Sequence, residues 1–168
     1  HSSRWLGLAR VHSTAYIDEV LNHHRTSQWS GARPDLAELA ALFAGGTLTA
    51  LDALLSGKTK TAIHFPGAKH HAQYDYSSGF CVFADFALAA DVATKDHGLK
   101  VAIFDIDAHH GDGTENLTAD NPNVLSYSVH EKGIFPGTGN ESNPEQNVYN
   151  LPLVSDDAGG GVGKGDAA

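Results

Sequence analysis

Apolar positions in the first third of the chain recur at the spacing of helices. Residues 13–21 place apolar side chains along one face, and Ser13 is suited to cap the helix start. A second helical pattern begins near Pro34, which fits a first turn, and runs to the glycine pair at 45–46. Helical spacing then resumes and stops at Gly57. The pattern predicts three helices here, the second and third separated by the glycine pair.

After residue 60, short apolar runs alternate with helical patterns. Strands are predicted at 62–65, 100–106, 124–129 and 148–153, and helices at 80–94 and 114–117. The run at 100–106 is continuously apolar, which favours a parallel strand covered on both faces. Strands that alternate with helices predict an α/β fold with a mainly parallel sheet.

The composition is that of a single domain with its own core. The chain has 168 residues, and 41% of them are hydrophobic. A formal net charge of -9 without a Lys and Arg cluster argues against a nucleic-acid partner and favours cationic substrates. The single cysteine, Cys81, cannot form an internal disulfide, and we find no signal-peptide pattern or apolar run of about 20 residues. We therefore expect a cytoplasmic protein without a membrane partner.

Polar clusters follow three of the predicted strands. The sequence DIDAHHGDG, residues 105–113, comes directly after the strand at 100–106. If the extended backbone continues, Asp105, Asp107 and His109 point to one face, because alternate side chains of a strand do so. A histidine pair at 70–71 and the polar residues at 128–130 follow two other strands. Since parallel strands end at one edge of a sheet, we expect one shared pocket.

These residue types suit a hydrolytic metal site. Catalytic zinc takes three protein ligands and an open position, and Asp107 and His109 would supply two of the three. Zinc lowers the pKa of bound water and polarises a carbonyl group, as amide hydrolysis requires. The histidine pair at 70–71 could take the proton from water. Asp105 and Asp112 are available to orient the two imidazole rings.

Three segments together resemble a known family. The segments FPGAKHHAQYDYSSGFCVF, VAIFDIDAHHGDGTE and SYSVHEKGIFPGTG are similar to the zinc-dependent histone deacetylases, including bacterial acetoin-utilisation relatives. The resemblance runs from VHSTAYIDEVL to the end of the chain. It implies a three-layer arginase/deacetylase-type α/β fold. It also implies a zinc-dependent amidohydrolase that removes acyl groups, such as acetyl, from lysine-like or polyamine substrates.

The resemblance carries roles to individual residues. It implies zinc ligands at Asp107 and His109, and an acid–base pair at His70 and His71 with carboxylate partners Asp105 and Asp112. It further implies that the Gly79 carbonyl binds the substrate amide and that Phe80 and Phe135 wall a narrow channel. Main-chain oxygens of five residues resemble a structural potassium site: Asp105, Asp107, His109, Ser128 and Val129.

The chain also departs from the family pattern. The family's third zinc-binding aspartate and its transition-state tyrosine follow the FPGTG loop, and neither is assigned here. The family usually has a further strand before the VHS segment, so residues 1–168 resemble a single partial domain truncated at both ends. The pair Ala68-Lys69 replaces the usual glycine and bulky apolar residue, and Ala84 stands where asparagine is common. We expect weak zinc binding, because only two ligands are assigned, and a homo-oligomer, because an incomplete sheet leaves an unpaired edge.

Other interpretations remain open at this point. The chain could be a catalytically inactive deacetylase-fold fragment that acts as a binding or assembly module. A two-metal ureohydrolase is disfavoured, since its second metal would need aspartate where Gly111 stands. Phe80 and Phe135 could be ordinary core aromatics, and Cys81 fits a buried small side chain better than a nucleophile. The segment AGGGVGKGD near the end lacks the complete phosphate-loop pattern and predicts a linker.

Overall fold

The computed structural model describes residues 7–29 and 33–154. The described helices are α2 (Thr14–Leu21), α3 (Leu36–Leu55), α4 (Asp85–Lys95) and α5 (Asp112–Thr118), with a 3-10 turn η1 (Pro144–Gln146). The strands are β1 (Val101–Asp105), β2 (Val124–Glu131) and β3 (Val148–Leu153). They form a parallel sheet in the order β1-β2-β3, so the predicted α/β fold with a parallel sheet is confirmed.

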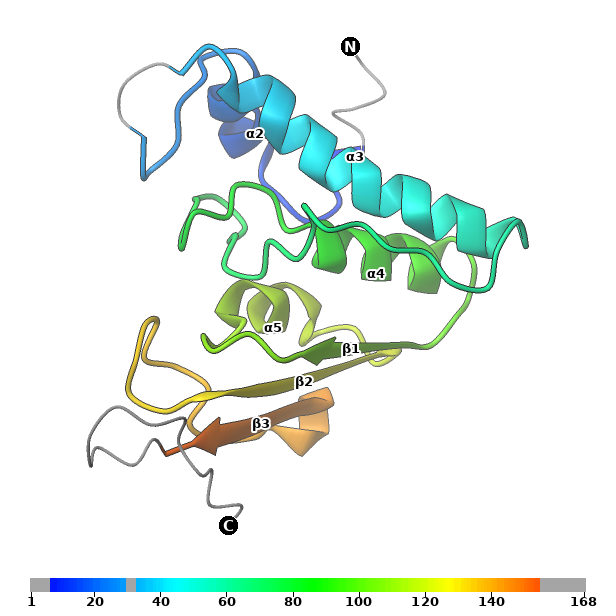
Figure 1. Cartoon of the computed structure of the whole chain (residues 1–168), viewed down its shortest axis with the longest axis vertical. Coiled ribbons are helices and arrows are strands. Elements are labelled where there is room, and N and C mark those ends of the chain that lie inside the picture. The colour runs from blue at the N-terminus through cyan, green and yellow to red at the C-terminus, as the bar shows by residue number, and fades with distance from the viewer. Residues whose placement is uncertain (1–6, 30–32, 155–168) are drawn as a thin grey trace.

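The helices pack beside one face of the sheet (Figure 1). Helices α4 and α5 contact β1 and β2, while α2 and α3 lie farther from the strands. Most of the core lies among the helices, around Ile17, Phe83 and Leu88. A smaller apolar cluster joins α4 to the sheet through Ala90, Ile103 and Val124. The sheet is therefore fixed to the helical half through α4 and α5.

Helix α3 corrects the prediction of two helices separated by a glycine pair. It continues through Gly45 and Gly46 for 20 residues. A Cβ atom at Gly46 would lie 2.2 Å from the ring of His64, so this glycine allows a neighbouring segment to approach. Gly46 therefore serves packing, and neither glycine ends the helix. Helix α2, in contrast, begins as predicted, because Ser13 accepts a hydrogen bond from the backbone N–H of Tyr16.

Helix α3 also has the length and apolar composition of a membrane span. The sequence expectation that no segment comes close to a span is therefore too strong for residues 36–55. Within the described chain, α3 packs against α2 and α4. A helix that packs in a folded domain can have the same composition as a span.

Two further predictions in the middle of the chain are wrong. Residues 62–65 form no strand, and the exposed side chains of Ile63 and Phe65 have no strand beside them in the described chain. The helix expected at 80–94 begins only at Asp85. Gly79 and Phe80 both adopt positive φ angles, which make a tight turn that a right-handed helix cannot include.

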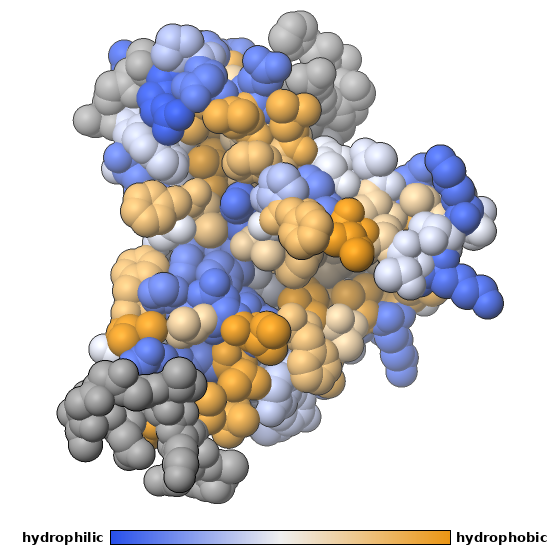
Figure 2. All heavy atoms as spheres, in the orientation of Figure 1, coloured by the Kyte–Doolittle hydropathy of each residue, from blue (hydrophilic) through white to orange (hydrophobic). Residues whose placement is uncertain are grey.

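The described residues cover only one face of the sheet. Ile103 and Ser126 lie on the face toward the helices and are buried, while Phe104 and Ile106 are 69% and 83% exposed. Phe104 stacks on Tyr127 of the neighbouring strand, with ring centroids 5.0 Å apart. Figure 2 shows apolar side chains gathered across the middle of the visible surface. The prediction that β1 is covered on both faces is therefore wrong for the described residues. The glycine-rich segment AGGGVGKGD lies outside them.

Candidate active site

Two buried histidines each contact a carboxylate. The Nδ1 atom of His70 lies 2.6 Å from Asp105, and the Nδ1 atom of His71 lies 2.6 Å from Asp112. The two rings pack together with centroids 4.0 Å apart. A carboxylate only accepts hydrogen bonds, so each Nδ1 donates its proton to the carboxylate, and Nε2 is the nitrogen available to gain or lose a proton. The prediction that the histidine pair lies against the acidic segment 105–112 is confirmed.

A series of short turns, and not an extended strand, brings the acidic residues together. Strand β1 ends at Asp105, and the backbone then bends. The Asp105 carboxylate accepts the backbone N–H of Asp107 at 3.1 Å, and Asp107 accepts the backbone N–H of His109 at 2.8 Å. The condition under which His109 would share a strand face with Asp105 and Asp107 is therefore not met, because the strand ends at Asp105. Aspartate favours such local turns because its side chain bonds to the backbone two residues on.

Helix α5 sets the position of the second carboxylate. Asp112 is the first residue of α5. Two successive side-chain hydrogen bonds fix the position of its carboxylate. Gln73 donates to Asp112 Oδ2 at 2.9 Å, and Asn116 donates to Gln73 at 3.0 Å. The backbone N–H of Thr114 also donates to the His70 carbonyl at 3.0 Å. Sequence reasoning missed Gln73 and Asn116, since neither stands in the acidic motif.

Glycines allow these groups to approach one another. A Cβ atom at Gly111 would lie 2.4 Å from Asp105 Oδ2 and 3.2 Å from His70 Nδ1. An aspartate at this position, which a second metal would need, would disrupt the His70–Asp105 pair. This geometry supports the sequence argument against a two-metal ureohydrolase.

Asp107 and His109 form a donor pair of the kind that zinc binds. The Asp107 Oδ1 and His109 Nδ1 atoms lie 3.0 Å apart. Two ligand atoms in tetrahedral zinc sites are separated by roughly 3.3 Å, given bonds of about 2.0–2.1 Å. The residues therefore fit as two ligands of one ion. Among residues 7–29 and 33–154, no group of three His, Cys, Asp or Glu side chains is placed to hold a metal.

The free nitrogen of His70 faces the same donor pair. Its Nε2 atom lies 4.0 Å from Asp107 Oδ1. Burial lowers the pKa of His70, but the hydrogen bond to Asp105 and the surrounding carboxylate charges outweigh burial and raise the pKa above its ordinary value. Burial raises the pKa of Asp107, but hydrogen bonds from His109 outweigh it, so this pKa lies below its ordinary value. Both shifts favour the charged forms of the two groups.

The aromatic residues expected to wall a channel are exposed. Phe80 is 81% exposed and Phe135 is 50% exposed, so neither is a core aromatic in the described chain. The Phe135 ring packs edge-on against His71, with centroids 5.0 Å apart. Gly79 has a φ of 51°, and a Cβ atom there would lie 2.2 Å from the His71 ring. Gly79 and Phe135 are therefore in reach of the histidine pair, while their roles toward a substrate stay predictions.

The residues expected to bind potassium lie at the same sheet end. Asp105 of β1 is the register partner of Ser128 in β2, and Val129 follows it. The Ser128 hydroxyl hydrogen-bonds to His130 Nδ1 at 2.9 Å. The described geometry brings the two strands' carboxyl ends together, and potassium binding there stays a prediction.

A second pair of buried histidines lies behind the site. His110 and His130 have ring centroids 4.7 Å apart. His110 hydrogen-bonds to Thr138 at 2.8 Å and to Glu115 at 3.0 Å, and His130 bonds to the Gly139 carbonyl at 3.0 Å. These bonds fasten the loop that contains Phe135 to α5 and β2. The sequence signal that could have pointed to His110 was the second histidine of DIDAHHGDG.

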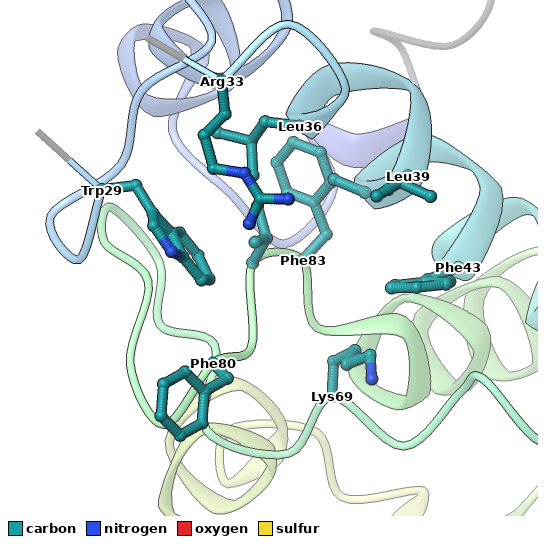
Figure 3. A pocket seen from close by; sticks show the side chains of 10 residues that line it. Trp29, Arg33, Leu36, Leu39, Phe43, Lys69, Phe80 and Phe83 are labelled. Carbon is teal, nitrogen blue, oxygen red and sulfur yellow. The ribbon is translucent and has the colours of Figure 1, made fainter. Parts of the chain in front are cut away.

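A cavity of about 200 Å³ lies beside Phe80. Aromatic and aliphatic side chains line it, and Arg33 and Lys69 approach it from different sides (Figure 3). The Lys69 ammonium lies 4.8 Å from the Phe43 ring centroid. The histidine pair is not part of the lining, so this cavity is separate from the hydrogen-bonded site. Cys81 is buried nearby as expected, and burial raises the pKa of its thiol.

Comparisons with known proteins match these observations. A family model described as histone deacetylase domain matches residues 6–161. Acetoin utilization protein AcuC of Staphylococcus aureus (strain MRSA252) is 36% identical over 150 residues, which cover 84% of this chain and 38% of that protein. AcuC of Bacillus subtilis (strain 168) is 44% identical over 104 residues, 61% of this chain and 27% of the relative. Histone deacetylase 8 of Xenopus tropicalis is 41% identical over 107 residues, 62% of this chain and 29% of the relative.

The matches agree with the sequence-based expectation. The chain spans less than two fifths of the length of each of these relatives. The family match and the parallel sheet together show the arginase/deacetylase type of α/β fold. This chain belongs to the histone deacetylase domain family.

Proposed function

We propose that this chain forms part of a zinc-dependent amidohydrolase that removes acyl groups from amines such as acetyl-lysine. The carrying observation is the pair of buried imidazoles, each hydrogen-bonded to its own carboxylate and packed against the other. Such pairs fix the tautomer and present Nε2 as a proton acceptor. The name of the histone deacetylase 8 relative supports the same reaction class.

His70 and His71 would exchange protons with water and with the amine product. Each ring already donates its Nδ1 proton to a carboxylate, so Nε2 is the atom that accepts or returns a proton. The carboxylates of Asp105 and Asp112 stabilise the positive charge of the imidazole rings when the rings are protonated. The buried position of both rings limits competing hydrogen bonds from bulk water.

Asp107 and His109 would hold the zinc ion. When bound, zinc would supply an activated water and polarise the scissile carbonyl. A further ligand would come from outside the described residues, because these residues provide only a pair. The exposed rings of Phe80 and Phe135 would flank the substrate chain, and the net charge of -9 favours a cationic amine.

The alternative of an inactive binding module has less support. A binding surface gains nothing from two buried imidazole–carboxylate pairs beside the metal-donor pair Asp107 and His109. Proton transfer, in contrast, uses this arrangement. The intact pairs therefore favour the hydrolase.

The proposal is tested by zinc titration calorimetry and a fluorogenic acetyl-lysine assay on the full chain. We expect weak zinc binding that His109→Ala abolishes, and turnover that His71→Ala lowers by at least about 100-fold. His23→Ala is the matched control, because His23 is exposed and contacts only Asp18 among the described charged groups. Zinc binding that is unchanged in His109→Ala, or the absence of both metal and turnover, would contradict the proposal.

A further inference from the structure

Asp85 is a fully buried carboxylate that the proposed chemistry does not use. It is the first residue of α4 and has 0% exposure. Its Oδ1 atom accepts the backbone N–H of Lys69 at 2.7 Å, and its Oδ2 atom accepts the backbone N–H of Ala68 at 3.0 Å. The Thr47 hydroxyl donates to Oδ2 at 2.5 Å. A buried carboxylate with three donors ties α3, α4 and the turn before the histidine pair together.

The turn that Asp85 holds has a backbone that needs support. Ala68 has a φ of 60°, in the left-handed region that favours glycine. A Cβ atom at Gly67 would lie 2.8 Å from Asp85 Oδ2 and 2.9 Å from Thr47 Oγ1, so only glycine fits there. The Asp85 carboxylate bonds two consecutive N–H groups of this turn, and His70 is the next residue. The direction in which the chain enters the site therefore depends on Asp85.

Thr47 and His64 complete the same network. The Thr47 hydroxyl has one proton, which it donates to Asp85. Thr47 must therefore accept at its contact with His64 Nδ1, 3.0 Å away, so His64 carries its proton on Nδ1. Gly46 leaves room for the His64 ring against α3. The network thus has a single consistent arrangement of donors and acceptors.

We propose that Asp85 is a positioning residue, which fixes the Gly67–Lys69 turn and thereby orients the imidazoles of His70 and His71. This inference rests on the proposed function only in treating the two histidines as the acid–base pair. The orientation itself can be observed without turnover.

The test follows the Nδ1 protons of His70 and His71 by NMR in the full chain labelled with ¹⁵N-histidine. Asp85→Asn should speed their exchange with solvent by at least about tenfold, because the turn no longer holds the rings against their carboxylates. The ring signals of His110 and His130 should stay unchanged, which shows that the fold is intact. Asp91→Asn is the matched control, since Asp91 is a buried carboxylate of α4 that pairs with Arg10 and Lys95 and does not bond to the turn.

If Asp85→Asn does not fold, a second pair of variants tests whether Asp85 orients the two histidine rings. Thr47→Val removes one donor to Asp85 at constant volume and should also speed the exchange, while Thr47→Ser should restore the original rate. Unchanged exchange in Asp85→Asn or Thr47→Val, or an equal change in Asp91→Asn, would overturn the inference. An absence of acetyl-lysine turnover with the expected exchange rates would contradict only the proposed function.

Discussion

His12 is a fully buried neutral imidazole with a hydrogen bond at each nitrogen. Its Nδ1 atom lies 2.8 Å from the Gln73 carbonyl, and the Ala84 N–H donates to Nε2 at 2.9 Å. Burial lowers the pKa of His12 to about 4 from its ordinary value of 6.5. The unfolded chain therefore binds a proton more readily than the folded chain between these pH values. Folding loses stability as the pH falls from about 6.5 to 4, and this loss is complete below pH 4.

We expect the chain to be about 2 kcal/mol less stable at pH 5 than at pH 7 through His12 alone. Urea unfolding of the wild-type chain and of His12→Gln at both pH values measures this contribution. The raised pKa of His70 changes the pH dependence of stability in the opposite direction. This contribution is the same in both proteins, so it cancels when the two are compared. An equal pH dependence in the two proteins would contradict the assignment.

Gly79 sets the position of the His71 ring. In Gly79→Ala, the new methyl group would meet the ring at about 2.2 Å, and the left-handed backbone would cost about 1–2 kcal/mol. We expect loss of the His71–Asp112 hydrogen bond, observed as disappearance of the His71 Nδ1–H signal. Gly133→Ala is the control, since Gly133 has a φ of 87° with open space around it. It should cost similar stability and leave the His71 signal in place.

At the scale of elements, α3 contains two adjacent glycines with different roles. Nothing lies within 4 Å of a Cβ atom at Gly45, whereas one at Gly46 would overlap the His64 ring. Gly45→Ala should therefore stabilise the chain by up to about 1 kcal/mol through helix propensity. Gly46→Ala should lose this gain and break the Thr47–His64 contact. Thermal unfolding of the two variants gives the comparison, and equal stabilisation by both would disprove the packing role of Gly46.

The elements that local pattern determines could be predicted from the sequence. Strand 148–153 and the start of α2 agree with the structure, since the apolar run and the Ser13 cap are local signals. The prediction that the glycine pair at 45–46 separates two helices was wrong, because Gly46 is needed for its contact with His64, which lies 18 positions further along the chain. The strand at 62–65 was wrong because a strand needs a partner, which local pattern does not reveal.

The site was predictable to the same degree. The motif DIDAHHGDG and the histidine pair identified both imidazole–carboxylate contacts. The supporting residues Gln73 and Asp85 received no role from the sequence, because they act through side-chain and backbone contacts that only the fold creates. The sequence left open whether the backbone stays extended after Asp105, because the apolar pattern does not show where the strand ends.

At the scale of the whole molecule, the sheet has one uncovered face in the described chain. Parallel sheets are usually covered on both faces, so the exposed side chains of Phe104 and Ile106 form an apolar surface that another layer would cover. We expect the isolated chain to self-associate through this face, consistent with the homo-oligomer expected from the sequence. Light scattering at increasing concentration measures the association.

The double variant Phe104→Thr, Ile106→Thr should shift the chain toward the monomer while keeping β-strand propensity. Leu42→Thr is the control, because Leu42 is an exposed apolar residue of α3, on another part of the molecule. A wild-type chain that stays monomeric over the whole concentration range would contradict the expectation.

The path from Asp105 to Asp112 has a consequence for how this gene can change. Asp105 is the last residue of β1 and Asp112 is the first residue of α5. Each carboxylate accepts a hydrogen bond from one ring of the neighbouring pair His70 and His71. Adding or deleting a single codon between Asp105 and Asp112 would rotate the helix start and pull one ring from its partner. Length variation among natural homologues should therefore be rare between these two positions.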